Sequence, residues 1–137
     1  MTSFFAGQGS VIQNMVHLTP REALDAIGRG ALLVDVREDF MIEMKVMGLP
    51  EILFLPRSRF KELYEGLPKD RPLILADCVG LYSKEAVAFL LAHGFTEVAN
   101  LNGGISAWEE AGLPMTVDPD HLWTGSCMCQ LKPRRDP

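Results

Sequence analysis

The segment Arg71-Pro-Leu-Ile-Leu-Ala-Asp-Cys-Val-Gly-Leu-Tyr-Ser-Lys84 joins an apolar run to a short glycine-containing loop and then to a helix-like stretch. Cys78 lies in this loop. Loop N–H groups and the positive end of a helix dipole both favour a thiolate, which is the reactive form of cysteine. The same position also suits an inert cysteine at a strand end, because free cysteine is among the most buried residue types.

Working outward, apolar runs alternate with helical patterns along most of the chain. Continuous apolar runs predict strands buried on both faces, as in a parallel sheet flanked by helices, and this alternation predicts an α/β fold. The runs are 31–36, 52–55, 73–76 and the shorter 97–100, and helices are expected at about 57–65, 83–93 and 104–111. Thr19, Pro20 and Glu22 predict a further helix start with a capping box.

Three parts of the chain are expected. Residues 1–14 show no firm period and are interpreted as a mobile or loosely docked N-terminal extension. Residues 15–115 form the domain, with a short edge strand at 15–18. Residues 116–137, rich in Pro, Gly and charge, form a C-terminal tail that contains Cys127-Met-Cys129.

Composition narrows the function classes. At 137 residues, 47% hydrophobic and 23% charged, the chain is typical of one soluble domain. A net charge of -5 argues against nucleic acid as a partner. No apolar stretch approaches the ~20 residues that span a membrane, and no signal peptide is recognised. Three cysteines without framework spacing argue against disulfides and favour a reducing cytoplasm.

Five motifs in order resemble the rhodanese-like domain over roughly residues 15–115. They are Leu32-Leu-Val-Asp35-Val-Arg37-Glu38, Leu55-Pro56, the strand–cysteine loop–helix unit, Gly94-Phe95, and Asn100-Leu-Asn-Gly103-Gly104-Ile-Ser-Ala-Trp108. The resemblance implies a small doubly wound α/β domain. It also implies sulfur transfer, in which a loop cysteine carries sulfane sulfur as a persulfide from a donor to a thiol acceptor, without organic cofactor or metal.

The loop departs from the family pattern, which reads Cys-x-x-Gly-x-Arg followed by Ser or Thr. In the register given by Gly94-Phe95, Ser83 matches the last residue and Asp77 stands at the nucleophile position. Cys78 comes one residue late, and Tyr82 replaces the arginine. A one-residue rearrangement would bring Cys78 among the loop N–H groups; otherwise the loop has lost its chemistry. Asp77 is expected to raise the pKa of the Cys78 thiol.

Two functions are therefore predicted. The first is a single-domain sulfurtransferase with Cys78 as persulfide carrier, fed by thiosulfate or a polysulfide and discharging to a small-molecule or protein thiol. Its active-site loop would comprise Asp77, Val79, Gly80, Leu81, Tyr82 and Ser83. The alternative is a catalytically inactive rhodanese-like binding or regulatory module. Phosphatase or arsenate reductase chemistry is disfavoured, because Lys84 lacks the bidentate fork of the arginine that ends such loops.

Residues outside the loop receive supporting roles. Asp35 and Arg37 would orient the loop or an anion, with a structural ion pair as the favoured interpretation. Arg57 and Arg59 would either begin a solvated helix or supply positive charge to the pocket. Cys127 and Cys129 are candidates for a sulfur relay, for half of a thiophilic metal site, or for no role. The oligomeric state is left open.

Overall fold

The computed structural model describes residues 4–5, 9–12, 15–38, 46–49, 51–116 and 126–127. Within this part of the chain, one sheet has the strand order β1-β2-β7-β6-β3-β5-β9. Its strands are β1 (Ser10–Ile12), β2 (Met15–Leu18), β3 (Leu32–Asp35), β5 (Ile52–Phe54), β6 (Leu73–Ala76), β7 (Val98–Leu101) and β9 (Ser126–Cys127). All neighbouring pairs are parallel except β1 with β2. A separate antiparallel pair joins β4 (Val46–Met47) to β8 (Met115–Thr116).

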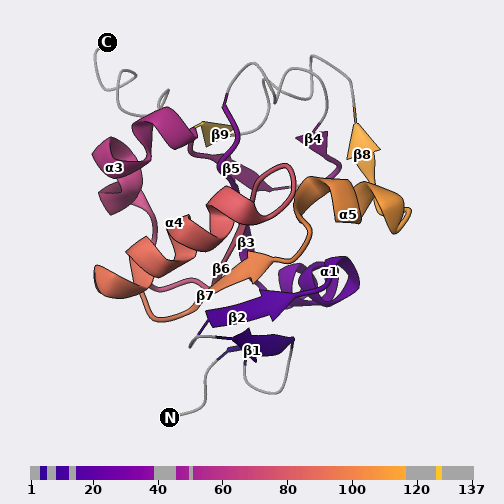
Figure 1. Ribbon diagram of the computed structural model, residues 1–137, viewed down its shortest axis with the longest axis horizontal. Coiled ribbons are helices and arrows are strands. Elements are labelled where there is room, and N and C mark those ends of the chain that lie inside the picture. Colours follow the sequence, from indigo (N-terminus) through magenta and orange to yellow (C-terminus); the bar gives the residue numbers. More distant parts are fainter. Residues whose placement is uncertain are drawn as a thin grey trace.

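Helices cover both faces of the sheet (Figure 1). They are α1 (Pro20–Gly28), α3 (Phe60–Leu63), α4 (Leu81–Ala92) and α5 (Gly104–Glu110), with short 3₁₀ turns η1 (Arg57–Arg59) and η2 (Tyr64–Gly66) around α3. The first hydrophobic core lies under α1 and α5, and the second lies under α3 and α4. The predicted α/β class with a parallel sheet is therefore confirmed.

Alternation along the central strands explains why these runs are continuously apolar. In β3, Leu33 packs into the first core whereas Leu32 and Val34 pack into the second. Successive side chains of a strand point to opposite faces, so a strand covered on both sides has no polar face. Trp108 of α5 is fully buried, and its Nε1–H donates to the Pro114 carbonyl over 2.8 Å.

The predicted capping box at α1 is present. The Glu22 N–H donates to the Thr19 hydroxyl, and the Thr19 N–H donates to the Glu22 carboxylate. The hydrogen bond from the Thr19 N–H is the largest cause of the lowered pKa of Glu22. The capping box could be predicted from the sequence because all of its partners lie within four residues of one another.

Both edges of the sheet differ from the sequence prediction. Residues 15–18 form an internal strand, because β1 pairs with β2 and takes the edge. Phe5, within the segment expected to be a loosely docked extension, is 2% exposed and packs in the first core. At the opposite edge, β9 from the expected tail pairs with β5. Short strands without a period of their own form here through pairing with the sheet.

The carboxyl ends of the central strands position the loop. Asp35 of β3 is in register with Ala76 of β6 and with Phe54 of β5. Residues 77–80 connect β6 to α4 directly above this row of strand ends (Figure 1). In open α/β sheets, ligands bind at this edge. No helix in the described residues is long and apolar enough to cross a membrane.

Candidate functional site

Asp77, the first residue of the loop, points its carboxylate into the cradle of backbone N–H groups. It accepts hydrogen bonds from the N–H of Gly80, of Tyr82 over 2.8 Å and of Ser83 over 3.3 Å. Gly80, with a φ of +90°, directs its N–H inward and is the N-cap of α4. Asp77 is buried, with 8% of its surface exposed. The three N–H donors and the N-terminus of α4 stabilise its carboxylate there.

The backbone of the same loop is held by the first turn of α5. The Ile105 N–H donates to the Asp77 carbonyl over 2.8 Å, and the Ser106 N–H donates to the Cys78 carbonyl over 2.9 Å. Gly104 permits this approach, because a Cβ there would lie 2.5 Å from the Asp77 carbonyl oxygen. Hydrogen bonds from α5 therefore hold the loop in the conformation in which the Asp77 carboxylate reaches the N–H groups.

Cys78 lies beside the cradle, and the residue is exposed. Partial burial is the largest cause of a raised pKa for its thiol, and the carboxylates of Asp77 and Asp35 raise that pKa further. The guanidinium of Arg37 acts in the opposite direction. The thiol is therefore less ionised at neutral pH than an ordinary cysteine, in contrast to the activation expected from its place before a helix.

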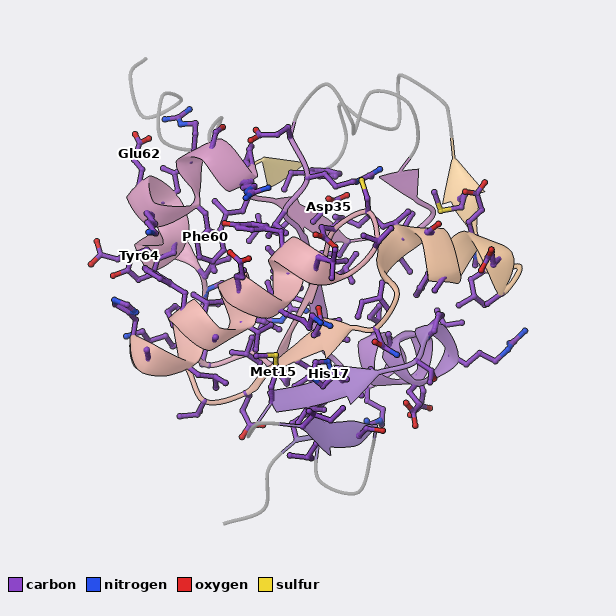
Figure 2. All side chains as sticks on the ribbon, in the orientation of Figure 1. Met15, His17, Asp35, Phe60, Glu62 and Tyr64 are labelled. Atoms are coloured by element: carbon purple, nitrogen blue, oxygen red, sulfur yellow. The ribbon has the colours of Figure 1, made fainter. Side chains whose placement is uncertain are left out.

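Asp35 and Arg37 form a buried ion pair at the end of β3, as the favoured interpretation predicted. The Arg37 Nη2 lies 2.9 Å from the Asp35 Oδ2, and its Nε lies 3.1 Å from Oδ1. The Arg37 N–H also donates to Asp35 over 3.0 Å. Asp35 is fully buried and Arg37 is 6% exposed. The pair fixes the strand end, and Figure 2 shows Asp35 near the centre of the molecule, close to the loop.

A cavity of about 300 Å³ opens beside the loop. It is lined by Val36, Arg37, Glu38, Arg57, Asp77, Cys78 and Tyr82. The Arg57 guanidinium lies 4.4 Å from the centre of the Tyr82 ring, and Tyr82 forms a wall of the cavity. Arg59 instead pairs with Glu62 over 3.1 Å. Of the two arginines considered, Arg57 brings positive charge to the cavity.

The rim of the loop is apolar. Val79 and Leu81, on either side of Gly80, are 53% and 64% exposed. These two side chains offer apolar contact area next to the cavity.

Behind the cradle, a chain of polar side chains crosses the interior, and the sequence analysis missed it. The Ser83 hydroxyl lies 3.5 Å from the Asp77 carboxylate and donates to the Asn100 Oδ1, while the Asn100 Nδ2 lies 3.2 Å from the His17 Nδ1. Ser83 and Asn100 are fully buried. No spacing rule joins residues on β2, α4 and β7, so only the fold reveals this chain.

The predicted relay cysteines are placed only in part. Cys127 lies in β9 and is in register with Phe54, in the row of strand ends that includes Asp35. Cys129 lies outside the described residues. Among the described residues, no group of three or more His, Cys, Asp or Glu side chains is arranged to hold a metal ion.

Fold and loop together define a rhodanese-like domain, and comparison with known proteins supports this class. The family model described as "Rhodanese-like domain" matches residues 19–111, so the chain belongs to the rhodanese-like family. A sulfurtransferase of Allochromatium vinosum is 37% identical over 86 residues, which cover 63% of this chain and 78% of that protein. The thiosulfate sulfurtransferase GlpE of Haemophilus influenzae is 29% identical, with 72% and 91% covered.

Solved structures agree with these relatives. A rhodanese-related protein from Thermoplasma volcanium superimposes with a TM-score of 0.68 at 24% identity, covering 74% of this chain and 98% of that one. A thiosulfate sulfurtransferase from Pseudomonas aeruginosa gives 0.64 at 26% identity, covering 82% of this chain and 20% of that one. The similarity to the Thermoplasma protein shows the fold. The three proteins named as sulfurtransferases suggest sulfur chemistry.

Proposed function

We propose that this chain is a rhodanese-like binding module whose loop does not carry sulfur in its N–H cradle. The observation that supports this function is the Asp77 carboxylate, which accepts the N–H groups of Gly80, Tyr82 and Ser83. In the family, those donors are expected to stabilise the anionic sulfur of a persulfide. Here the carboxylate side chain of Asp77 occupies those donors.

Electrostatics oppose sulfur uptake at the same place. A second anion would have to displace a carboxylate that holds three charge-assisted hydrogen bonds, or share the cradle with a like charge. The nearest thiol, Cys78, has a raised pKa and therefore a small thiolate fraction at neutral pH. The loop also has Tyr82 where the family has the arginine that would bind a dianionic donor.

The proposed ligand is an acidic group carried by a partner protein. Arg57 lines the cavity and provides positive charge for a carboxylate, whereas the charge of Arg37 is paired with Asp35. Val79 and Leu81 at the rim offer apolar contact area, which a small inorganic anion would not use. The chain would then recognise its partner with the loop surface and work in a reducing compartment such as the cytoplasm.

A second candidate is sulfur carriage on Cys78 outside the cradle. It is favoured by the exposure of Cys78 on the cavity wall, by the adjacent Arg37, and by relatives named sulfurtransferases. In this reaction the Cys78 thiolate attacks the sulfane sulfur of a donor, forms a new S–S bond, and releases sulfite from thiosulfate or a thiolate from a persulfide. An acceptor thiol, with Cys127 and Cys129 as candidates, would then take the sulfur.

Mass spectrometry with peptide mapping distinguishes the two functions. The full chain is exposed to thiosulfate and, separately, to polysulfide, alongside the variants Asp77→Cys and Asp77→Asn. We expect no added sulfur on Cys78 of the unaltered chain or of Asp77→Asn, and added sulfur on residue 77 of Asp77→Cys, where the cradle would receive a thiolate. Stable sulfur on Cys78 of the unaltered chain would reject the binding module in favour of the second candidate, and its onward appearance on Cys127 or Cys129 would establish the relay.

A further inference from the structure

A second cavity, of about 550 Å³, lies between α4 and the strands β1 and β2. It is lined by Ser10, Ile12, Met15, His17, Thr19, Lys84, Glu85, Ala88 and Asn102. Figure 2 labels Met15 and His17 on β2, where their side chains lie beside α4. The residues around this cavity do not include any that line the cavity at Cys78.

The lining combines polar and apolar side chains. Lys84 and His17 provide nitrogen groups, and Thr19 and Asn102 add polar groups at the same cavity. Ile12, Met15 and Ala88 provide apolar surface. Glu85 adds one negative charge, which disfavours a dianion such as phosphate. A small monoanion with an apolar portion matches this arrangement, since a single carboxylate would neutralise Lys84 and leave its carbon chain against the apolar side chains.

His17 is also the outer end of the polar chain that begins at Asp77. The Asn100 Nδ2 faces the His17 Nδ1 over 3.2 Å, and with this amide orientation a neutral imidazole accepts at Nδ1. The Asn100 Oδ1 then faces Ser83 and takes the only hydroxyl proton of that residue. In this state the Ser83 proton is not available to the Asp77 carboxylate, which lies 3.5 Å away.

Protonation of His17 would reverse each of these hydrogen bonds. Two donors, Nδ1–H and the amide Nδ2, would then face each other, and the conflict is removed when the Asn100 amide turns by half a rotation. The Asn100 Oδ1 would accept from His17, and its Nδ2 would donate to the Ser83 oxygen. The Ser83 proton would be released toward Asp77, which would gain a further donor.

From the cavity and this chain of side chains, we propose that the cavity binds a small carboxylic acid at Lys84 and His17, and that binding is transmitted through Asn100 and Ser83 to Asp77. A carboxylate beside His17 favours the imidazolium form, and the reversed hydrogen bonds follow from it. The groups around His17 are Lys84 and Glu85 of α4, together with the uncharged Ser10 of β1, Asn100 of β7 and Asn102 of the turn after β7. Burial first, and Lys84 second, lower the pKa of His17, so the imidazole is neutral until an anion arrives. The inference holds for either function of the loop.

NMR of the full chain tests the proposal, with sodium butanoate as the probe and 1-butanol as its uncharged control. We expect butanoate to raise the pKa of the His17 imidazole by about one unit, as a nearby opposite charge does, and butanol to leave it unchanged. Lys84→Met, which keeps the length of the side chain and removes its charge, should abolish this response. An unchanged His17 pKa, or an equal response in Lys84→Met, would overturn the proposed site.

The coupling from His17 to Asp77 is measured separately. The amide protons of Gly80 and Tyr82, which donate to Asp77, should shift as His17 gains its proton, with the same midpoint as the imidazole. His17→Gln cannot take up a proton, and its half-exposed position makes it a mild substitution. In this variant both amide signals should stay constant over the same pH range. Amide signals of Gly80 and Tyr82 that do not change as His17 gains its proton in the unaltered chain would overturn the coupling.

Discussion

At the scale of single residues, the site depends on which of two neighbours enters the cradle. Asp77 accepts three N–H groups, while Cys78, one position later, lies on the cavity wall. In this loop conformation the N–H groups are taken up by the Asp77 carboxylate, and the exposed Cys78 lies beside them. The identity of residue 77 therefore decides whether the N–H groups stabilise a carboxylate or a sulfur atom.

The carboxylate should also control the reactivity of the neighbouring thiol. Burial remains the largest cause of the raised Cys78 pKa in Asp77→Asn, but the substitution removes a second cause, the neighbouring carboxylate. Alkylation of Cys78 by iodoacetamide at pH 7.5 should therefore accelerate about threefold. In both proteins the rate should rise with pH, with the higher midpoint in the unaltered chain. Peptide mapping separates Cys78 from Cys127 and Cys129. Asp25→Asn, a change on the exposed surface of α1, is the control, and equal rates in all three proteins would contradict the assignment.

At the scale of elements, the first turn of α5 determines the loop conformation. The N–H groups of Ile105 and Ser106 bind the carbonyls of Asp77 and Cys78, and this contact requires the backbone to approach Gly104 closely. The one-residue rearrangement considered for Cys78 would have to break both hydrogen bonds. The loop is thus specified by a segment that follows it by more than 20 residues.

A matched pair of glycine substitutions tests this contact. Gly104 and Gly112 have φ values of +65° and +78°, but only at Gly104 would a Cβ collide with the loop. Gly112→Ala should lower the free energy of unfolding by about 1–2 kcal/mol through backbone strain alone. Gly104→Ala should cost about 4 kcal/mol or more, a loss typical of such collisions. Chemical denaturation measures both, and similar losses would show that α5 does not constrain the loop.

These elements also show how far sequence reasoning reaches. The capping box at Thr19, the buried run of β3 and the glycine turn before α5 were predictable, because each is encoded by neighbouring residues. The edge strands β1 and β9 were not, since each is short and forms by pairing with a distant segment. Asp77 was recognised at the nucleophile position, but the direction of its side chain depends on α5, and the link to His17 depends on β7.

At the scale of the whole molecule, the described residues near the N-terminus, 4–5 and 9–12, contact the rest of the fold. Phe5 packs in the core under α1, the Phe4 N–H donates to Glu97 over 2.8 Å, and β1 covers the edge of β2. An uncovered strand edge is a template for pairing with another chain. These residues therefore contribute both packing and protection against association.

Removal of residues 1–14 should show both contributions. The free energy of unfolding should fall by about 3–5 kcal/mol, the usual cost of losing one buried aromatic side chain. The shortened chain should also associate as its concentration rises, because β2 becomes the edge. Thermal unfolding and analytical ultracentrifugation measure these effects, with Val11→Ser as the control, since Val11 is 67% exposed. A truncated monomer with unchanged stability would restore the interpretation of residues 1–14 as an extension.

The sheet order has a consequence for how this domain can be joined to others. The first and last strands, β1 and β9, occupy opposite edges of the seven-stranded sheet, so six inter-strand spacings of roughly 4.8 Å, or about 29 Å, separate them. A domain fused ahead of β1 and another fused after β9 would be attached near opposite edges of the sheet. In such a fusion, the width of this sheet would determine the distance between the two added domains, and both of them would adjoin the same central domain.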